Sequence, residues 1–255
     1  MLLRIAQIKI CPEKGKLEEN HRRLMSVFSD LSSHSPDVVV TPECFLDGYV
    51  STKKTVTKKS ILPYAISPKT SPYAQAVSDW AKQNKSWVIY GCTRLEKYKV
   101  YNTALIFNRK GKIIGSYDKT HCQTHDHKYT AGKHLPIFKS DFGIFGILIC
   151  ADRRWPEAVR TLALKGARII FNPTYGMHDE RNLHMMQTRS YESEVFIVFT
   201  HPKQALVTAP SGGVVSNVIA NDRAYVITEI DLAEVDKARA AEQAHLKDRR
   251  PEIYK

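Results

Sequence analysis

Residues 145–157 read Phe145-Gly146-Ile147-Leu148-Ile149-Cys150-Ala151-Asp152-Arg153-Arg154-Trp155-Pro156-Glu157. A run without charges stops at a cysteine, and a turn with two arginines leads to a proline and an acid. An apolar run of this kind predicts a strand that is covered on both faces. Pro156 suits the first position of a helix, and Glu157 complements the helix dipole. The pattern predicts a buried strand, a sharp turn and a helix, with Cys150 at a helix N-terminus that favours its thiolate.

The composition is that of an ordinary soluble globular protein. The chain has 255 residues, of which 43% are hydrophobic and 25% are charged, and we expect one domain over residues 1–255. No stretch predicts a membrane span or a signal peptide. Five unclustered cysteines argue against a disulfide framework and indicate a cytoplasmic location. The net charge of +12 comes without a nucleic-acid motif, so it predicts a basic surface or an anionic small substrate, not a nucleic-acid or membrane partner.

Strands and helices are interleaved along the chain, and some strands are paired by hairpin turns. This pattern predicts an α/β layered domain with mixed sheets, and the number of strands suits two sheets better than one. The predicted strands are residues 2–11, 37–41, 86–94, 100–108, 112–117, 145–149, 167–172, 196–200, 205–209, 214–219 and 224–231, and the predicted helices are residues 17–31, 71–84, 156–166 and 180–194. The remaining C-terminal residues are charged and predict a tail.

Three chemically unusual residues stand at the ends of predicted strands: Glu43, Lys119 and Cys150. Each alone has an ordinary interpretation, as a solvated loop acid, a surface lysine and a small packing residue. Together they fit one chemistry. A thiolate nucleophile needs a base to take its proton and a positive group to stabilise the oxyanion, and a carboxylate and an ammonium can supply these.

The motifs around these residues are similar to those of the nitrilase, or carbon-nitrogen hydrolase, superfamily. The matching segments are Pro42-Glu43-Cys44-Phe45-Leu46-Asp47-Gly48-Tyr49, Tyr117-Asp118-Lys119-Thr120-His121, residues 150–157, Asn172-Pro173 and residues 249–254. The resemblance implies a four-layer α-β-β-α sandwich with two mixed β-sheets, which forms a homodimer or a higher homo-oligomer. It also implies that Glu43 is the general base, that Lys119 stabilises the tetrahedral intermediate and that Cys150 attacks.

The resemblance also implies a substrate site and one departure from the family pattern. Many members carry a second glutamate before the glycine that corresponds to Gly132, but here His125 and Asp126 are the candidates for that role. The segment from Asp152 to Glu157 is similar to that of N-carbamoyl-D-amino-acid hydrolases, in which an arginine pair is associated with the substrate carboxylate. We expect Arg153 to be structural and Arg154 to face the pocket. The expected substrate-binding residues are Tyr49, His121, Ala151 (through its N–H in the oxyanion hole), Arg153, Arg154, Asn172 and Thr174.

Other functions remain open at this point. The substrate could instead be a simple aliphatic or ω-amide or a nitrile. The segment from His121 to His127, with Cys122 and Asp126, could bind zinc in a metal-dependent hydrolase, although it lacks a defined ligand spacing. The departure at the second glutamate would also suit an inactive, nitrilase-like interaction protein. We favour hydrolysis of an amide or carbamoyl group by a Glu-Lys-Cys triad, without a metal or an organic cofactor.

Overall fold

The computed structural model describes residues 1–219 and 223–254, and these form two six-stranded sheets. In the first sheet, the strands β1, β2 and β3 are parallel, and antiparallel strands flank them on both sides. The order in this sheet is β12 (Tyr225–Asp231), β1 (Leu2–Ile8), β2 (Val38–Val40), β3 (Trp87–Glu96), β4 (Lys99–Phe107) and β5 (Ile113–Asp118).

The second sheet repeats this design. Its central strands β7, β8 and β9 are parallel, and the outer strands pair with them in antiparallel fashion. The order is β11 (Val214–Val218), β10 (Gln204–Thr208), β9 (Phe196–His201), β8 (Ile169–Pro173), β7 (Gly143–Ile147) and β6 (Ile137–Ser140). Both sheets are therefore mixed.

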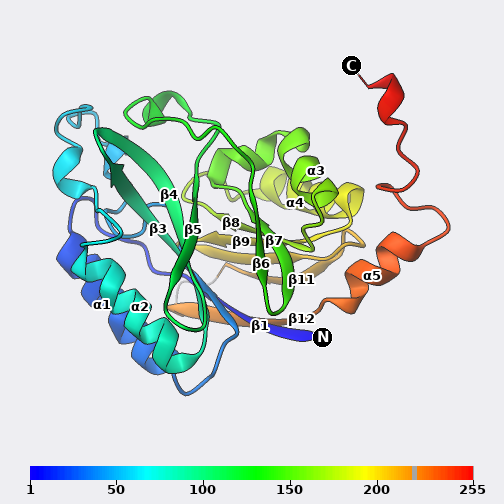
Figure 1. Ribbon diagram of the computed structural model, residues 1–255, viewed down its shortest axis with the longest axis horizontal. Coiled ribbons are helices and arrows are strands. Elements are labelled where there is room, and N and C mark those ends of the chain that lie inside the picture. Colours follow the sequence, from blue (N-terminus) through cyan, green and yellow to red (C-terminus); the bar gives the residue numbers. More distant parts are fainter. Residues whose placement is uncertain (220–222, 255) are drawn as a thin grey trace.

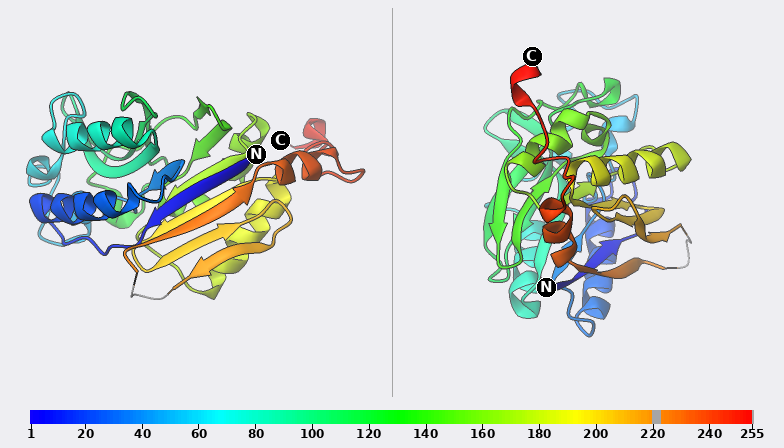
Figure 2. Two further views of the ribbon diagram at one scale, coloured as in Figure 1. Left: turned by 90° about the horizontal axis from the view of Figure 1, so that it is seen from below. Right: turned by 90° about the vertical axis from the view of Figure 1, so that its right-hand side faces the viewer.

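Helices cover the outer faces of the two sheets (Figures 1 and 2). The helices α1 (Leu17–Leu31) and α2 (Pro72–Asn84) lie over the first sheet, and α3 (Pro156–Leu164) and α4 (Glu180–Ser193) lie over the second. A short helix α5 (Ala233–Ala240) follows β12. The predicted four-layer α-β-β-α sandwich is confirmed.

The alternation of side chains along the strands connects these layers. Val38 and Val40 point into the core between the two sheets, where they join Phe171 of the second sheet. Val39 points the other way, into a second core beneath α1 and α2. Because neighbouring strand residues face opposite sides of a sheet, one apolar strand can serve both cores. This explains why the central strands read as continuous apolar runs.

Most predicted elements are confirmed, with three differences. The strand predicted over residues 145–149 is β7, which ends at Ile147, and a 3-10 turn over Cys150–Arg154 separates it from α3. The short edge strand β6 was not predicted. The helix α5 was not predicted either, because it buries only Val235 and therefore lacks an apolar face. None of the helices in the described residues is long and apolar enough to cross a membrane.

Candidate active site

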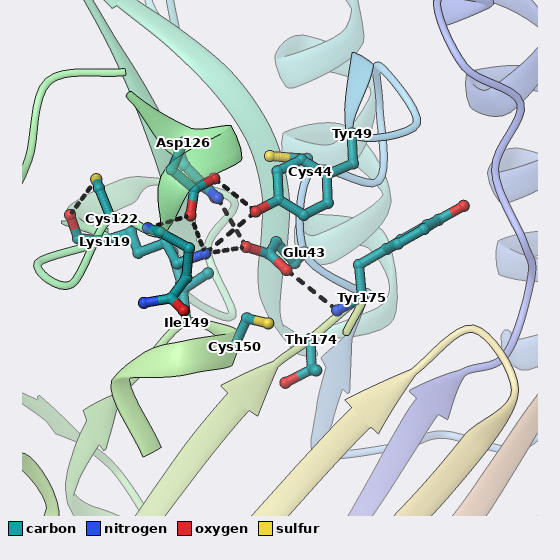
Figure 3. Close-up of polar contacts among 12 residues, drawn as sticks. Glu43, Cys44, Tyr49, Lys119, Cys122, Asp126, Ile149, Cys150, Thr174 and Tyr175 are labelled. Atoms are coloured by element: carbon teal, nitrogen blue, oxygen red, sulfur yellow. Dashed lines mark hydrogen bonds and ion pairs between the residues drawn. The ribbon is translucent and has the colours of Figure 1, made fainter. Parts of the chain in front are cut away.

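The three predicted catalytic residues meet at one end of the sandwich (Figure 3). Glu43 follows β2, Lys119 directly follows β5, and Cys150 begins the turn after β7. Glu43 and Lys119 are each 1% exposed, and Cys150 is 8% exposed. The Nζ of Lys119 donates to Oε1 of Glu43 at 2.8 Å, and the sulfur of Cys150 faces this pair (Figure 3). The residues come together because the carboxyl ends of parallel strands from both sheets lie at the same edge.

Lys119 has a second acidic partner. Its Nζ also donates to Oδ2 of Asp126 at 2.7 Å and to the hydroxyl of Tyr49 at 3.2 Å. The Tyr49 hydroxyl donates to Oδ1 of Asp126 at 2.5 Å. Its oxygen therefore accepts the proton on Nε2 of His125, which lies 3.0 Å away. Of the two candidates for the second acid, Asp126 contacts Lys119 directly, whereas Nε2 of His125 lies 3.0 Å from the Tyr49 hydroxyl and 3.9 Å from Oδ2 of Asp126.

The charges around Lys119 and Cys150 act on their pKa values in different ways. Burial alone would lower the pKa of Lys119, but attraction to the carboxylates of Glu43 and Asp126 outweighs it, so the pKa is raised and the ammonium is retained. Burial, followed by repulsion from Glu43, raises the pKa of the Cys150 thiol, although Lys119 and Arg153 oppose this shift. The expected preference of Cys150 for the thiolate is therefore wrong for the resting site. The thiol is held in its neutral form, so a base has to remove its proton.

Further groups hold the Glu43 carboxylate in place. Asn102 of β4 donates from Nδ2 to Oε1 at 2.8 Å, and the backbone N–H of Tyr175 donates to Oε2 at 3.1 Å. The position of the Tyr175 peptide depends in turn on His201. The backbone N–H of Lys203 donates to Nδ1 of His201 at 3.0 Å, so Nε2 carries the proton and donates to the Tyr175 carbonyl at 3.2 Å.

The His201 ring is neutral at physiological pH. Burial is the main cause that lowers the pKa of His201 to about 3, and the nearby charges of Arg153 and Lys203 act in the same direction. A neutral ring can accept one hydrogen bond and donate the other, as the geometry at Lys203 and Tyr175 requires. His201 therefore supports Glu43 indirectly, because it holds the carbonyl group of Tyr175, the residue whose backbone N–H donates to Glu43.

Asp152 connects the segment around Lys119 to the turn that begins at Cys150. Its buried carboxylate accepts hydrogen bonds from Tyr117 OH at 2.8 Å and from the backbone N–H of His121 at 2.8 Å, on either side of Lys119. It also accepts the backbone N–H of Ile149 at 2.9 Å, next to Cys150. The His121 side chain is fixed by the same carboxylate, because Nδ1 donates to Oδ1 at 2.8 Å and the ring stacks on Trp155.

The two arginines after the nucleophile have different surroundings. Arg153 is buried, and its guanidinium donates to Asn182 Oδ1 at 2.7 Å, to the Cys150 carbonyl at 2.6 Å and to the Met177 carbonyl at 2.7 Å. These contacts fix the turn, and they occupy the guanidinium donors with groups of the protein itself. Arg154 is exposed, and its Nη1 donates to Gln123 Oε1 at 3.1 Å.

The segment after β8 forms the wall beside the sulfur. Asn172 donates from Nδ2 to the Leu148 carbonyl at 2.8 Å and so braces the strand before the nucleophile. The Thr174 hydroxyl donates to the Asn172 carbonyl at 3.1 Å. A Cβ added to Gly176 would lie 3.2 Å from the Cys150 sulfur, so the glycine leaves room there. Cys150 itself has φ +46°, a left-handed conformation that is uncommon for a residue with a side chain and is often found at functional sites.

The histidine-rich loop is not arranged as a metal site. His121 turns to Asp152, Asp126 is paired with Lys119, and the Cys122 sulfur lies 3.8 Å from the Lys119 carbonyl. Within residues 1–219 and 223–254, no group of three or more His, Cys, Asp or Glu side chains could hold a metal ion. The structure therefore disfavours the zinc hypothesis because the candidate ligands serve other partners.

Five contributors to the site were missed by the sequence analysis: Asn102, Asp152, the Tyr175 peptide, Gly176 and His201. Asp152 lay inside a quoted motif and, as an acid next to a nucleophile, could have been singled out. The others have no local signal, since a backbone N–H, an amide on a neighbouring strand and a distant histidine become relevant only through the fold.

Comparisons with known proteins agree with this fold. A family model described as carbon-nitrogen hydrolase matches residues 2–240. The chain therefore belongs to the carbon-nitrogen hydrolase family, within the nitrilase superfamily of hydrolases and amidases. It is 28% identical over 99% of its length to "Hydrolase in pqqF 5'region" from Pseudomonas protegens, of which 90% is covered.

Two further comparisons concern the yeast Saccharomyces cerevisiae. The chain is 24% identical to omega-amidase NIT3, over 99% of this chain and 94% of the relative. The crystal structure of Nit3 superimposes with a TM-score of 0.82 at 23% identity, over 93% of each chain. The superfamily and the sandwich fold are thus confirmed, and the closer resemblance to N-carbamoyl-D-amino-acid hydrolases stays a prediction.

Proposed function

We propose that this enzyme hydrolyses the C–N bond of a small amide or N-carbamoyl compound and releases ammonia through a thioester on Cys150. The observation that carries the proposal is the buried Lys119–Glu43 ion pair facing the sulfur. Burying two charges is costly unless they are paired, and a pair at this position provides a base and an electrostatic partner for one nucleophile.

In the first half of the reaction, Glu43 accepts the thiol proton of Cys150 as the sulfur attacks the carbonyl carbon. Negative charge moves to the carbonyl oxygen, where the Lys119 ammonium and the Ala151 N–H stabilise it. Collapse of this intermediate breaks the C–N bond, and Glu43 returns the proton to the leaving nitrogen. Ammonia leaves, and the acyl group remains on sulfur as a thioester.

In the second half, a water molecule replaces ammonia beside Glu43. The carboxylate takes a proton from this water as its oxygen attacks the thioester carbon, and Lys119 stabilises the second oxyanion. Cleavage of the C–S bond releases the carboxylic acid, and the proton returns to sulfur. With an N-carbamoyl substrate the released acid is a carbamic acid, which loses CO₂ and leaves the amine. Asp126 and Tyr49 keep the ammonium in one position through both halves, so little reorganisation is needed as charge develops.

We further propose that the substrate carries a carboxylate, as an ω-amide of a dicarboxylic acid or an N-carbamoyl amino acid does. The net basic chain and the similarity to a protein named omega-amidase support this choice. Arg153 is committed to the turn, whereas the exposed Arg154 retains donors for a ligand. A homodimer or higher homo-oligomer in the cytoplasm belongs to the same proposal, and light scattering of the purified chain tests the assembly.

The test is ammonia release from a panel of ω-amides, N-carbamoyl amino acids, neutral amides and nitriles. Cys150→Ala should abolish turnover while the melting temperature is kept, and Cys92→Ala, a buried cysteine on β3, is the matched control that retains activity. Turnover by Cys150→Ala would refute the mechanism. Absence of turnover by the wild type across the whole panel would favour the inactive interaction protein.

A further inference from the structure

A small basic pocket lies on the far side of the loop that borders the nucleophile. Its volume is about 220 Å³. It is lined by Cys11, Tyr175, Gly176, His178, His201, Pro202 and Lys203. None of these residues is acidic.

The positive character of this region extends beyond the pocket. A neighbouring pocket of about 470 Å³ shares Cys11, Pro202 and Lys203 and adds Lys9, Arg23 and Arg223 to its walls, again without an acid. The Arg23 side chain is held beside this pocket by a hydrogen bond, because its Nη1 donates to the Cys11 carbonyl at 3.0 Å. A hollow surrounded by one sign of charge concentrates ligands of the opposite sign.

The same loop links the basic pocket to the chemistry. Gly176 lines the basic pocket, and a Cβ added to Gly176 would lie 3.2 Å from the Cys150 sulfur. Tyr175 is another wall, and its N–H holds Glu43. The Tyr175–Gly176 segment therefore lies between the Cys150 sulfur and this pocket, and at Gly176 it carries no side chain.

The two arginines that follow Cys150 are less suitable than Lys203 for binding the carboxylate of the proposed substrate. Arg153 already donates to Asn182 and to two carbonyl groups. Arg154 lies on the side of the turn that meets Gln123, in the loop that carries Asp126. Lys203 lies on the opposite side, in the β9–β10 turn, where it is exposed and lines both basic pockets.

We propose that this pocket binds the carboxylate end of the substrate and that the Lys203 ammonium is its principal contact. The inference rests on the proposed amide hydrolysis and assigns the recognition of the carboxylate to Lys203, on the opposite side of the nucleophile from Arg154. Arg23 adds positive potential from behind, and His178, which stacks on His201 at 4.2 Å, closes one wall.

Two substrates of equal length test the assignment: succinamate, which ends in a carboxylate, and butyramide, which ends in a methyl group. Lys203→Gln should lower kcat/KM for succinamate about five- to thirtyfold, as expected for the loss of one charge-assisted contact in a partly solvated site. Butyramide hydrolysis should stay within about twofold of the wild type. Lys203→Arg should retain most of the activity on succinamate.

Lys58→Gln is the matched control, because it removes one exposed positive charge elsewhere. Arg154→Gln tests the competing assignment, in which Arg154 holds the carboxylate. Lys58 lines a different basic pocket, beside His125 and Lys128. A selective loss on succinamate in Lys58→Gln or in Arg154→Gln, or an equal loss on both substrates in Lys203→Gln, would overturn the inference and leave the amidase chemistry intact.

Binding without turnover separates the two proposals. Glutarate should bind to Cys150→Ala protein in a calorimeter, and adding Lys203→Gln should weaken that binding about five- to thirtyfold. If the wild type releases no ammonia from either substrate, the proposed function fails, while the calorimetry still decides the carboxylate site. Equal affinity of both proteins for glutarate refutes the role of Lys203.

Discussion

Replacing Asp126 by Asn tests how the site controls its catalytic lysine. In the wild type, Lys119 lies between two carboxylates, with its Nζ 2.8 Å from Glu43 and 2.7 Å from Asp126. Asn keeps the shape of Asp126 but removes its charge. It also replaces one acceptor oxygen with a donor, where the carboxylate accepts from Tyr49, from Lys119 and from the backbone N–H of Gln123.

The magnitude follows from burial. Asp126 is fully buried and Lys119 is 1% exposed, so water cannot compensate for the missing charge. Removing one partner of a buried ion pair costs about 3–5 kcal/mol. In a chain of this size that corresponds to a fall in melting temperature of roughly 6–20 °C. Because Lys119 would no longer be held against the developing oxyanion, kcat/KM should fall about a hundredfold.

The pH range of the measurement follows from the sign of the lysine shift. The pKa of Lys119 is raised above its ordinary value of 10.5 in the folded protein. Its stabilising effect is therefore fully present below pH 10.5 and is lost only as the pH rises through the folded pKa. The stability deficit of Asp126→Asn should accordingly be constant between about pH 6 and 9, as measured by thermal unfolding followed by circular dichroism.

Two variants serve as comparisons. Asp126→Glu keeps the charge but adds a methylene to a packed site, so it should retain more activity than Asp126→Asn. Glu96→Gln removes an exposed partner of Arg94 and should leave the melting temperature and the activity nearly unchanged. If folded Asp126→Asn protein hydrolyses amides at the wild-type rate, Asp126 does not support Lys119 in catalysis, and the role assigned to it here is wrong.

Two other variants test the surroundings of Cys150. Gly176→Ala places a Cβ 3.2 Å from the sulfur at a residue without a left-handed backbone, so the melting temperature should be kept while kcat/KM falls at least about tenfold, most for bulky acyl groups. Gly213→Ala is its control, because the added Cβ there has the same clearance from a serine oxygen. Unchanged activity in Gly176→Ala would mean that the substrate does not use the space beside the sulfur. Asp152→Asn turns one acceptor into a donor facing other donors, so it should lower stability by about 1–3 kcal/mol and reduce the rate of Cys150 alkylation and turnover together. Loss of stability with full turnover would show that the contact from Asp152 to Ile149 is not needed to position the nucleophile.

The sequence alone was sufficient for the fold class and for the choice of Glu43, Lys119 and Cys150 as candidate reacting groups. Apolar runs before Glu43 and Cys150 predicted two buried strands, and the strand of a hairpin led to Lys119, since periodicity and charge are local properties of the chain. The same local reasoning failed at α5, where a charged helix has no apolar face, and at the Cys150 thiol, where an expected helix field was outweighed by burial.

The tertiary structure alone decided how these groups are held and which neighbours act on them. Asp126 rather than His125 meets Lys119, because the 3-10 turn of residues 124–126 buries the acid and leaves the histidine partly exposed. Glu43 is fixed by Asn102 from another strand and by the Tyr175 peptide from the other sheet. Such contacts join residues 59 and 132 positions apart, and no local pattern records them, because they form only when the carboxyl ends of the two sheets are brought to one edge by packing.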